Sequence, residues 1–278
     1  MVKWIVDSFI FEENRIPEES FNDAGIEFFT FDYIPFLTDK IKIPYSTSEP
    51  IITYSSLNAV NHLTSYYGCY YDRFNYNCNV FMSLLDVPPS EFLNHDHMYC
   101  SFQDLLNNYN FYFDLFRWDD LFFRPNAGRK EFTGNVFSRE SMKSELSAID
   151  SMYNMSKDSM ILVSTPKRIK EEIRFVIGNR EILGSSRYRV NDKKLEDDQV
   201  KPECTEYIKK LLDTNTWVPD DLFVIDLAMI EEESKIVPKI IELNSFSCSG
   251  WYGGIDTAQM IKKVSEIVER NFKKDNEL

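Results

Sequence analysis

Two carboxylates and one amide stand on two consecutive apolar segments in the last third of the sequence. Asp226 follows Phe-Val-Ile, while Glu242 follows Ile-Ile and is separated from Asn244 by one residue. Because side chains two positions apart on a strand point to the same face, Glu242 and Asn244 project together. If the turn between the segments centres on Ser234, position 226 pairs with position 242, and the three side chains converge on one face of two neighbouring strands.

A cation is the natural occupant of such a set. Two carboxylates on an apolar sheet repel each other and lose hydration unless a positive charge lies between them. Carboxylate and amide oxygens are the ligands that magnesium prefers, and magnesium also keeps water and substrate phosphates in its shell. A solvent-facing sheet with ordinary polar residues remains an equal alternative on these residues alone.

Cations and glycines occur together further upstream. Arg124 precedes Pro125 at the end of an expected strand, and Lys130 lies in the following loop between Gly128 and Gly134. Backbone amides in such a loop can hold phosphate, to which Lys and Arg add charge. The Walker pattern is absent, so a plain surface loop is the alternative interpretation.

A third candidate group follows a short apolar strand. Glu172 and Arg174 alternate with Ile173 and Phe175, so the two charged side chains share a face, and Arg187 stands in the next expected strand. Arginine can bind phosphate through two parallel hydrogen bonds. A cross-strand ion pair is the alternative.

Alternating and periodic apolar residues predict the elements that position these groups. A hairpin is expected around Gly178-Asn179, a second one around the acidic turn EEES, and a final helix from an Asp256 cap. The expected strands cover residues 2–6, 26–33, 51–54, 160–164, 172–178, 181–190, 222–230 and 236–244, and an amphipathic helix covers 138–153.

Composition narrows the class of protein. Hydrophobic residues make up 43% and charged residues 27% of the 278 residues, as in ordinary globular proteins. The formal net charge is −14 and no Lys/Arg block is present, which argues against nucleic acid as the main partner. The five cysteines form no CxxC pair, which argues against a zinc site or a disulfide framework.

The distribution of apolar residues favours a protein with no membrane partner. No apolar run approaches the roughly 20 residues that span a bilayer. The first residues, MVKWIVDSFIFEEN, meet acidic side chains too early for a signal peptide. We expect a soluble protein in a reducing cytoplasm.

Five segments, taken in order, carry a resemblance to a known family. They are YYDRFNYNCNVFMSLL, FFRPNAGRKEFTG, LVSTPKRIKEEIRFVIGNREILGSSRYRV, FVIDLAMI and IIELNSFSCSGWYGG. The last four, within residues 121–270, resemble the ATP-grasp superfamily, and they look closest to a phage and viral clade named for one arginine and two lysines. The first segment resembles the subdomain that precedes the ATP-grasp domain in that clade.

The resemblance implies an α+β ATP-grasp fold, in which two α+β subdomains enclose ATP behind a smaller N-terminal pre-grasp subdomain. We place the pre-grasp subdomain at residues 1–100 and the ATP-grasp domain at 101–278. A phage or viral source would place the protein in the host cytoplasm.

The resemblance also assigns roles to individual residues. Asp226, Glu242 and Asn244 match the magnesium ligands, and Arg174 and Arg187 match the paired arginines that stabilise an acylphosphate. The remaining matches form the ATP-binding set: Arg124 at the phosphates, Lys130 in the lid loop, Val163 and Ser164 at the adenine hinge, and Glu172. Two positions depart from the family pattern: Arg124 replaces the usual lysine, and the lysine usually found just before the hinge is not evident near Met160, whereas Lys167 follows the hinge.

The implied activity is carboxylate–amine ligation through an acylphosphate, with ATP and Mg²⁺ as cofactors and release of ADP and phosphate. The substrates are an acid and an amine of unknown identity, each a small molecule or the terminus of a peptide or protein. Two alternatives stay open: a small-molecule kinase with the same fold, and a non-catalytic nucleotide-binding protein.

Overall fold

The computed structural model describes residues 1–8, 15–34, 43–46, 48–67, 75–128 and 131–276. They fall into two compact units, neither of which is one continuous stretch of chain. The first unit combines Met1–Phe74, Glu171–Leu227 and Glu242–Leu278, and the second combines Asn75–Lys170 and Ala228–Ile241. The subdomain boundary predicted at residue 100 stays a prediction. Among the described residues, no helix has the length and apolar character needed to cross a membrane.

The first unit begins with a small parallel sheet of order β2-β1-β3. Its strands are β1 (Lys3–Asp7), β2 (Phe28–Phe31) and β3 (Ile51–Tyr54), joined by helix α1 (Glu18–Ala24) between β1 and β2 and followed by α2 (Leu57–Tyr67). Parallel neighbours cannot be joined by a tight turn, which explains the crossover through α1. The carboxyl ends of all three strands therefore lie at one edge of this sheet.

A five-stranded sheet of order β10-β9-β8-β11-β12 carries most of the charged candidates. Its strands are β8 (Ile169–Gly178), β9 (Glu181–Val190), β10 (Lys193–Asp197), β11 (Leu222–Glu232) and β12 (Lys235–Ser245), with helices α6 (Pro202–Thr214) and α7 (Thr257–Asn276) in the same part of the chain. The turn residues Asn179, Arg180, Glu233 and Ser234 all have positive φ, as two-residue hairpins require. The second hairpin is thus centred between Glu233 and Ser234, half a residue before the predicted centre.

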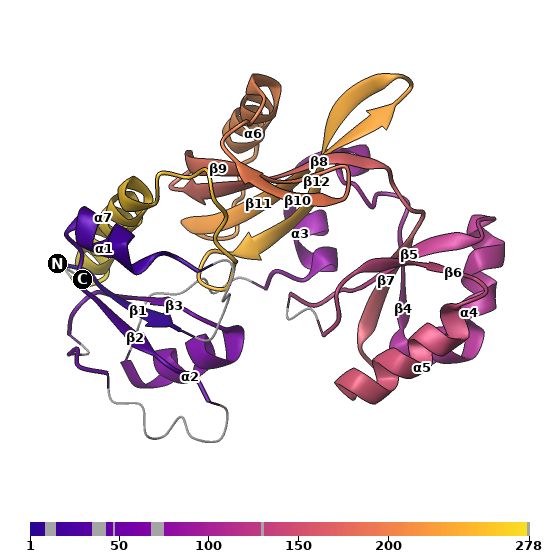
Figure 1. Cartoon of the computed structure of the whole chain (residues 1–278), viewed down its shortest axis with the longest axis horizontal. Helices are drawn as coiled ribbons and strands as arrows, with labels where there is room; N and C mark the ends of the chain where they lie inside the picture. Colours follow the sequence, from indigo (N-terminus) through magenta and orange to yellow (C-terminus); the bar gives the residue numbers. More distant parts are fainter. Residues whose placement is uncertain (9–14, 35–42, 47, 68–74, 129–130, 277–278) are drawn as a thin grey trace. The chain divides into compact units, whose positions relative to one another are not determined.

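Apolar side chains of α7 and of the N-terminal sheet form one core in the first unit. Trp4 is fully buried, and its indole nitrogen donates a hydrogen bond of 2.9 Å to the Ser265 hydroxyl of α7. Val176 of β8 and Val224 of β11 belong to the same core, and α1 lies beside α7 (Figure 1). The predicted cap of the last helix is confirmed, because the Asp256 carboxylate accepts a 3.0 Å bond from the amide of Gln259.

The second unit is built around an antiparallel sheet of order β4-β7-β5-β6. Its elements are α3 (Cys78–Leu84), the 3₁₀ helix η2 (Pro89–Glu91), β4 (Met98–Ser101), α4 (Phe102–Phe116), β5 (Asp120–Pro125), β6 (Asn135–Ser138), α5 (Met142–Tyr153) and β7 (Met160–Ser164). Helices α4 and α5 pack on this sheet, where Phe113, Phe123 and Phe137 form much of the core (Figure 1). The helix predicted from residue 138 begins only at Met142, because 135–138 pair with β5.

Gly254 fixes the loop that follows β12, and its replacement should be costly. Its φ is +89°, and a Cβ atom there would lie 2.4 Å from the carbonyl carbon of Asp197. Gly25 is a matched control, since its φ is +68° but no atom lies within 4 Å of its Cβ position. We expect Gly25→Ala to lower the free energy of unfolding by about 1 kcal/mol, the cost of left-handed backbone. Gly254→Ala should cost clearly more in the same urea titration, and an equal loss would contradict the close packing.

Candidate active site

Four polar side chains meet on β8, β11 and β12, which are consecutive strands of the five-stranded sheet. Arg174 lies two residues before Val176 on β8, and Asp226 lies two residues after Val224 on β11. Arg174 therefore lies on the same face of the sheet as Val176, and Asp226 on the same face as Val224. Both valines belong to the core of the first unit. Asp226 is only 1% exposed, so its carboxylate needs compensating partners inside the protein.

Arg174 is the main partner of Asp226. Its Nε and Nη2 donate hydrogen bonds of 2.8 and 2.7 Å to the two oxygens of the carboxylate, and its Nη1 donates one of 2.8 Å to the Gly250 carbonyl. Burial by itself would lower the pKa of Arg174, but the adjacent Asp226 carboxylate holds that pKa above its usual value. A bidentate ion pair is thus buried in the site.

Two stacked tyrosines contact the guanidinium of Arg174. The rings of Tyr188 and Tyr252 are stacked with centroids 4.6 Å apart, and the guanidinium carbon lies 4.7 Å from the Tyr252 centroid and 5.8 Å from that of Tyr188. Burial raises the pKa of both phenols, so both stay neutral. Cation–π contact and hydrogen bonding together fix the orientation of the arginine.

Asn244 joins the two carboxylates. Its Nδ2 donates hydrogen bonds of 3.0 Å to Asp226 Oδ2 and of 2.9 Å to Glu242 Oε1. The three side chains that were expected to converge therefore do lie together on one face. Glu242 is 7% exposed, so two buried carboxylates face one amide group.

The donor set fits a magnesium ion. A half-turn of the Asn244 amide would bring its oxygen, in place of its nitrogen, next to one oxygen of Asp226 and one of Glu242, so the three side chains can supply the carboxylate and amide oxygens that magnesium prefers. Each carboxylate oxygen can accept two bonds, so the pair with Arg174 does not exhaust Asp226. Within the described part of the chain, no group of three or more His, Cys, Asp or Glu is arranged for a metal.

Glu172 lies beside this cluster. Burial raises the pKa of its carboxyl group, the Tyr188 hydroxyl and Arg189 oppose that rise, and the Asp226 and Glu242 charges add to it. Arg189 Nη1 lies 3.5 Å from Glu172 Oε1. The Glu172 carboxyl group is therefore close enough to Asp226 and Glu242 to be affected by their negative charges. This agrees with the prediction that Glu172 and Arg174 share one face of the strand.

Arg187 is held by a different set of partners. The pairing between β8 and β9 shifts by one residue between Glu172 and Ile173, so Arg187 stands opposite Ile173 rather than opposite Arg174. Its guanidinium lies 2.7 Å from Asp197 and 3.7 Å from Glu171. The structure thus shows the ion pair that was the alternative interpretation, and a catalytic role for Arg187 stays a prediction.

The Arg187–Asp197 pair should make stability depend on pH. The hydrogen bond from Arg187 holds the pKa of Asp197 below its usual value, against the opposing effect of burial. The pair therefore stabilises the protein above the unfolded-state pKa of about 3.9, and this stabilisation is lost as pH falls through the lowered pKa. Because both side chains are partly exposed, we expect Arg187→Gln to cost at most about 1 kcal/mol in urea titrations near neutral pH. The difference should shrink below about pH 4, and a constant difference would contradict the pairing.

The other nucleotide candidates belong to the second unit. Arg124 on β5 is 7% exposed and lies opposite Leu162 of β7. Val163 and Ser164 on β7 are fully buried, and the Ser164 hydroxyl donates a hydrogen bond of 3.1 Å to the Asn94 side chain. The absence of a side chain at Gly134 lets its backbone lie close to Arg124, since a Cβ atom at residue 134 would be 2.9 Å from Cβ of Arg124.

Two lysines were considered for nucleotide binding, Lys130 and Lys167, and the structure describes only the second of them. Lys130 lies outside the described residues. Lys167 pairs with Asp96 at 2.8 Å and donates a bond of 3.0 Å to the Thr165 carbonyl. Its ammonium group is therefore engaged within the second unit.

Tyr188 and Tyr252 are site residues that the sequence analysis did not single out. Tyr188 stands in the strand after Glu172 and Arg174, and Tyr252 follows the Glu242–Asn244 segment by eight residues. Tyr188 directly follows Arg187, and this adjacency is the signal that could have indicated it. Their contact with Arg174 depends on long-range pairing that local spacing does not reveal.

The family follows from comparison with known proteins. An ATP-grasp domain family, the second of the clade named for one arginine and two lysines, matches residues 114–263, more than half of the chain. The chain belongs to this ATP-grasp family. The match includes Arg174, Asp226, Glu242 and Asn244, so the whole cluster lies inside the family domain. No curated protein matches the chain significantly.

Solved structures show the same fold. D-cycloserine synthetase DcsG superposes with a TM-score of 0.60 at 11% identity, over 95% of this chain and 100% of that chain. D-alanine–D-alanine ligase from Bacillus anthracis gives 0.57 at 13% identity, over 99% of each chain. ATP-grasp ligase PsnB gives 0.53 at 8% identity, over 96% of this chain and 98% of that chain. The predicted α+β ATP-grasp fold is confirmed.

Proposed function

We propose that this chain is an ATP- and magnesium-dependent ligase that joins a carboxylate to an amine through an acylphosphate. One observation carries the proposal: Asn244 bridges two buried carboxylates beside a buried, oriented arginine, within an ATP-grasp family domain. Several of the similar solved structures are ligases or synthetases, and one of them is a complex with ATP. These likenesses support the ligase interpretation by analogy.

Asp226, Glu242 and Asn244 are the residues that would hold Mg²⁺. When bound, the ion would neutralise and orient the phosphates of ATP. Their position on strands, rather than on loops, keeps the three side chains in place before the nucleotide arrives.

Arg174 would stabilise the charge that develops during the reaction. A substrate carboxylate oxygen attacks the γ-phosphorus, and the bond to ADP breaks. An amine then attacks the acyl carbon, phosphate leaves with that carboxylate oxygen, and the amine loses a proton. Because Arg174 is fixed by Asp226, Gly250 and two tyrosines, its positive charge needs no reorganisation at either step.

The remaining assignments complete the proposal. Glu172 would contact the nucleotide beside the metal ligands, Arg124 and Lys130 would contact phosphate, and the backbone of 163–164 would meet adenine. Arg187 would assist Arg174 if its pair with Asp197 opened. A phage or viral source, and with it the host cytoplasm, is proposed from the clade alone.

Hydroxylamine distinguishes this chemistry from that of a kinase. It traps an acylphosphate as a hydroxamate, so the protein is incubated with Mg–ATP and a panel of carboxylic acids, with and without hydroxylamine. We expect hydroxamate and ADP to form together only with an accepted acid. A stable phosphorylated alcohol, with no hydroxamate from any acid, would establish the kinase alternative instead.

A further inference from the structure

The loop that follows β12, residues 246–254, carries two of the groups that hold Arg174. The Gly250 carbonyl accepts a hydrogen bond of 2.8 Å from Nη1 of Arg174, and the Tyr252 ring centroid lies 4.7 Å from the guanidinium carbon. Asp226 holds the other side of the guanidinium, through Nε and Nη2. The direction of Nη1 therefore depends on where this loop lies.

Two residues at the end of β3 hold the 246–254 loop. The Tyr54 hydroxyl donates a hydrogen bond to the Ser249 carbonyl, and the Ser55 amide donates one of 2.9 Å to the Ser247 carbonyl. Tyr54 is 1% exposed, and its ring meets that of Phe246 edge-on with centroids 6.1 Å apart. Burial raises the pKa of Tyr54 above its usual value, so its hydroxyl keeps the proton that it donates. All these contacts lie within the first unit.

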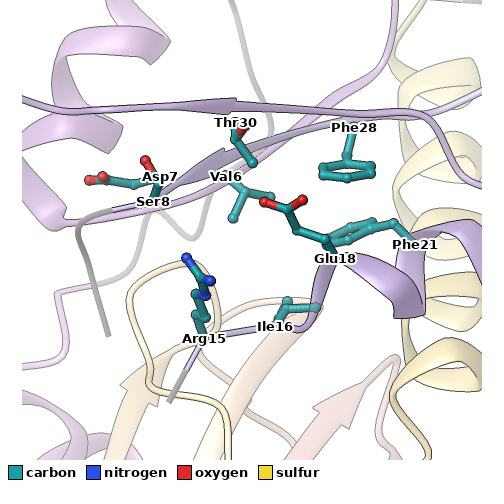
Figure 2. Close-up of a pocket in the computed structure, with 9 residues that line it drawn as sticks. All are labelled: Val6, Asp7, Ser8, Arg15, Ile16, Glu18, Phe21, Phe28 and Thr30. Atoms are coloured by element: carbon teal, nitrogen blue, oxygen red, sulfur yellow. The ribbon is translucent and has the colours of Figure 1, made fainter. Parts of the chain in front are cut away.

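The end of β3 is itself fixed to β1. The Ser55 hydroxyl donates a bond of 2.9 Å to the Asp7 carboxylate, which also accepts one of 3.4 Å from the Tyr33 amide. Figure 2 shows the end of β1, where this carboxylate points away from the rings of Phe21 and Phe28. Asp7 is 2% exposed, so the bonds that it accepts are shielded from water. The loop is therefore held by a fixed edge of the N-terminal sheet.

The bond from Tyr54 acts on the peptide group that precedes the Gly250 carbonyl. The Ser249 carbonyl and the Gly250 amide belong to one planar peptide group. Because Gly250 has no side chain, its backbone torsions are little restricted, and contacts with other residues set the direction of its carbonyl. A small hollow lined by Tyr54, Arg174 and Trp251 borders this peptide group. The peptide group and the guanidinium therefore have room to shift when a contact is removed.

We propose that Tyr54 is a positioning residue that fixes the orientation of Arg174 through this peptide group. Without the Tyr54 hydroxyl, the Gly250 carbonyl is free to turn away from Nη1, while the two bonds to Asp226 stay. The guanidinium then keeps its charge and its carboxylate partner but loses the third bond that sets its direction. That this direction matters to the reaction rests on the proposed ligase function, whereas the orientation itself does not.

Exchange of the Arg174 side-chain protons with water tests the orientation directly, by nuclear magnetic resonance on the full-length chain without nucleotide. The Arg174 signals are assigned by their absence from the double variant Arg174→Met with Asp226→Leu. In Tyr54→Phe, we expect the Nη1 protons to exchange about tenfold faster than in the wild type, as for the loss of one hydrogen bond. The Nε proton, which is bonded to Asp226, should exchange as in the wild type.

Tyr112→Phe is the matched control, because it also removes only a hydroxyl group. Tyr112 is 4% exposed, and its hydroxyl likewise donates a hydrogen bond, to Asp104. Tyr112 belongs to the second unit, so this change should lower stability without altering the Arg174 signals. Chemical denaturation shows that both variants are folded and compares their losses of stability.

The rate of ADP release separates positioning from a purely structural role. With Mg–ATP and an acid that the wild type accepts, Tyr54→Phe should lower kcat by about ten- to a hundredfold, because small misplacements of an active-site group cost this much. The midpoint of the magnesium titration should stay that of the wild type, since Asn244 keeps its bond to Glu242. Tyr112→Phe should change neither quantity.

Unchanged exchange of the Nη1 protons in Tyr54→Phe, or the same change in Tyr112→Phe, would overturn the proposal. Faster exchange with an unchanged kcat would establish the orientation by Tyr54 and count against the role of Arg174 in the proposed reaction. If the wild type releases no ADP with any acid, the ligase proposal fails, and the exchange measurement still decides whether Tyr54 orients Arg174.

Discussion

Changing Asp226 to Asn should lower the free energy of unfolding by about 3–5 kcal/mol, the usual cost of removing one partner from a buried ion pair. The change leaves the Arg174 guanidinium charged and buried, with two hydrogen bonds of 2.8 and 2.7 Å weakened or lost. Chemical denaturation of the wild type and the variant measures the loss. A loss below about 1 kcal/mol, the value for an exposed pair, would contradict the buried pairing.

The double change Arg174→Met with Asp226→Leu is the control for this prediction. Replacing both members of a buried pair with apolar residues is often neutral, because no uncompensated charge remains. We therefore expect the double variant to be more stable than Asp226→Asn alone. This coupling also means that Asp226 variants are poor probes of magnesium binding, since lost stability and lost metal affinity would be mixed.

Changing Glu242 to Gln should lower Mg–ATP-dependent ADP release by at least about a hundredfold, because even residues that only support metal ligands cost ten- to a hundredfold when changed. Gln keeps the size of the side chain and can still bond to Asn244, while Arg174 keeps its partner Asp226. The midpoint of a magnesium titration, read by ADP release, should move to higher concentration.

Glu181→Gln is the matched control for Glu242→Gln. Glu181 is exposed at the start of β9, so neutralising it removes the same charge without touching the site. Its rate and magnesium midpoint should be those of the wild type. Unchanged magnesium dependence in Glu242→Gln would remove Glu242 from the metal site.

Local spacing was sufficient to predict the hairpins and the meeting of Glu242 with Asn244. Side-chain direction on a strand alternates with period two, and turn residues mark where strands end. Both features therefore depend only on a few neighbouring residues. The convergence with Asp226 is confirmed by its bond from Asn244, but the predicted pairing of 226 with 242 assumed a turn centre half a residue later than the observed one.

The pairing of Arg174 with Asp226 could not be predicted in the same way. The two residues are 52 positions apart, and nothing in the sequence shows that β8 lies next to β11. The place of Arg187 was missed for a different reason. A one-residue shift between Glu172 and Ile173 moves it away from Arg174, and such bulges leave no clear mark in the sequence.

Transfer of heavy oxygen from an acid to phosphate tests the central claim most directly. Amino and carboxylic acids labelled with heavy oxygen in the carboxylate are incubated with Mg–ATP, an amine and the protein, and the released phosphate is examined by mass spectrometry. Ligation through an acylphosphate predicts one labelled oxygen in each phosphate, together with ADP, and loss of this signal in Glu242→Gln. Phosphate that carries no label while ADP and a joined product form would contradict the acylphosphate route.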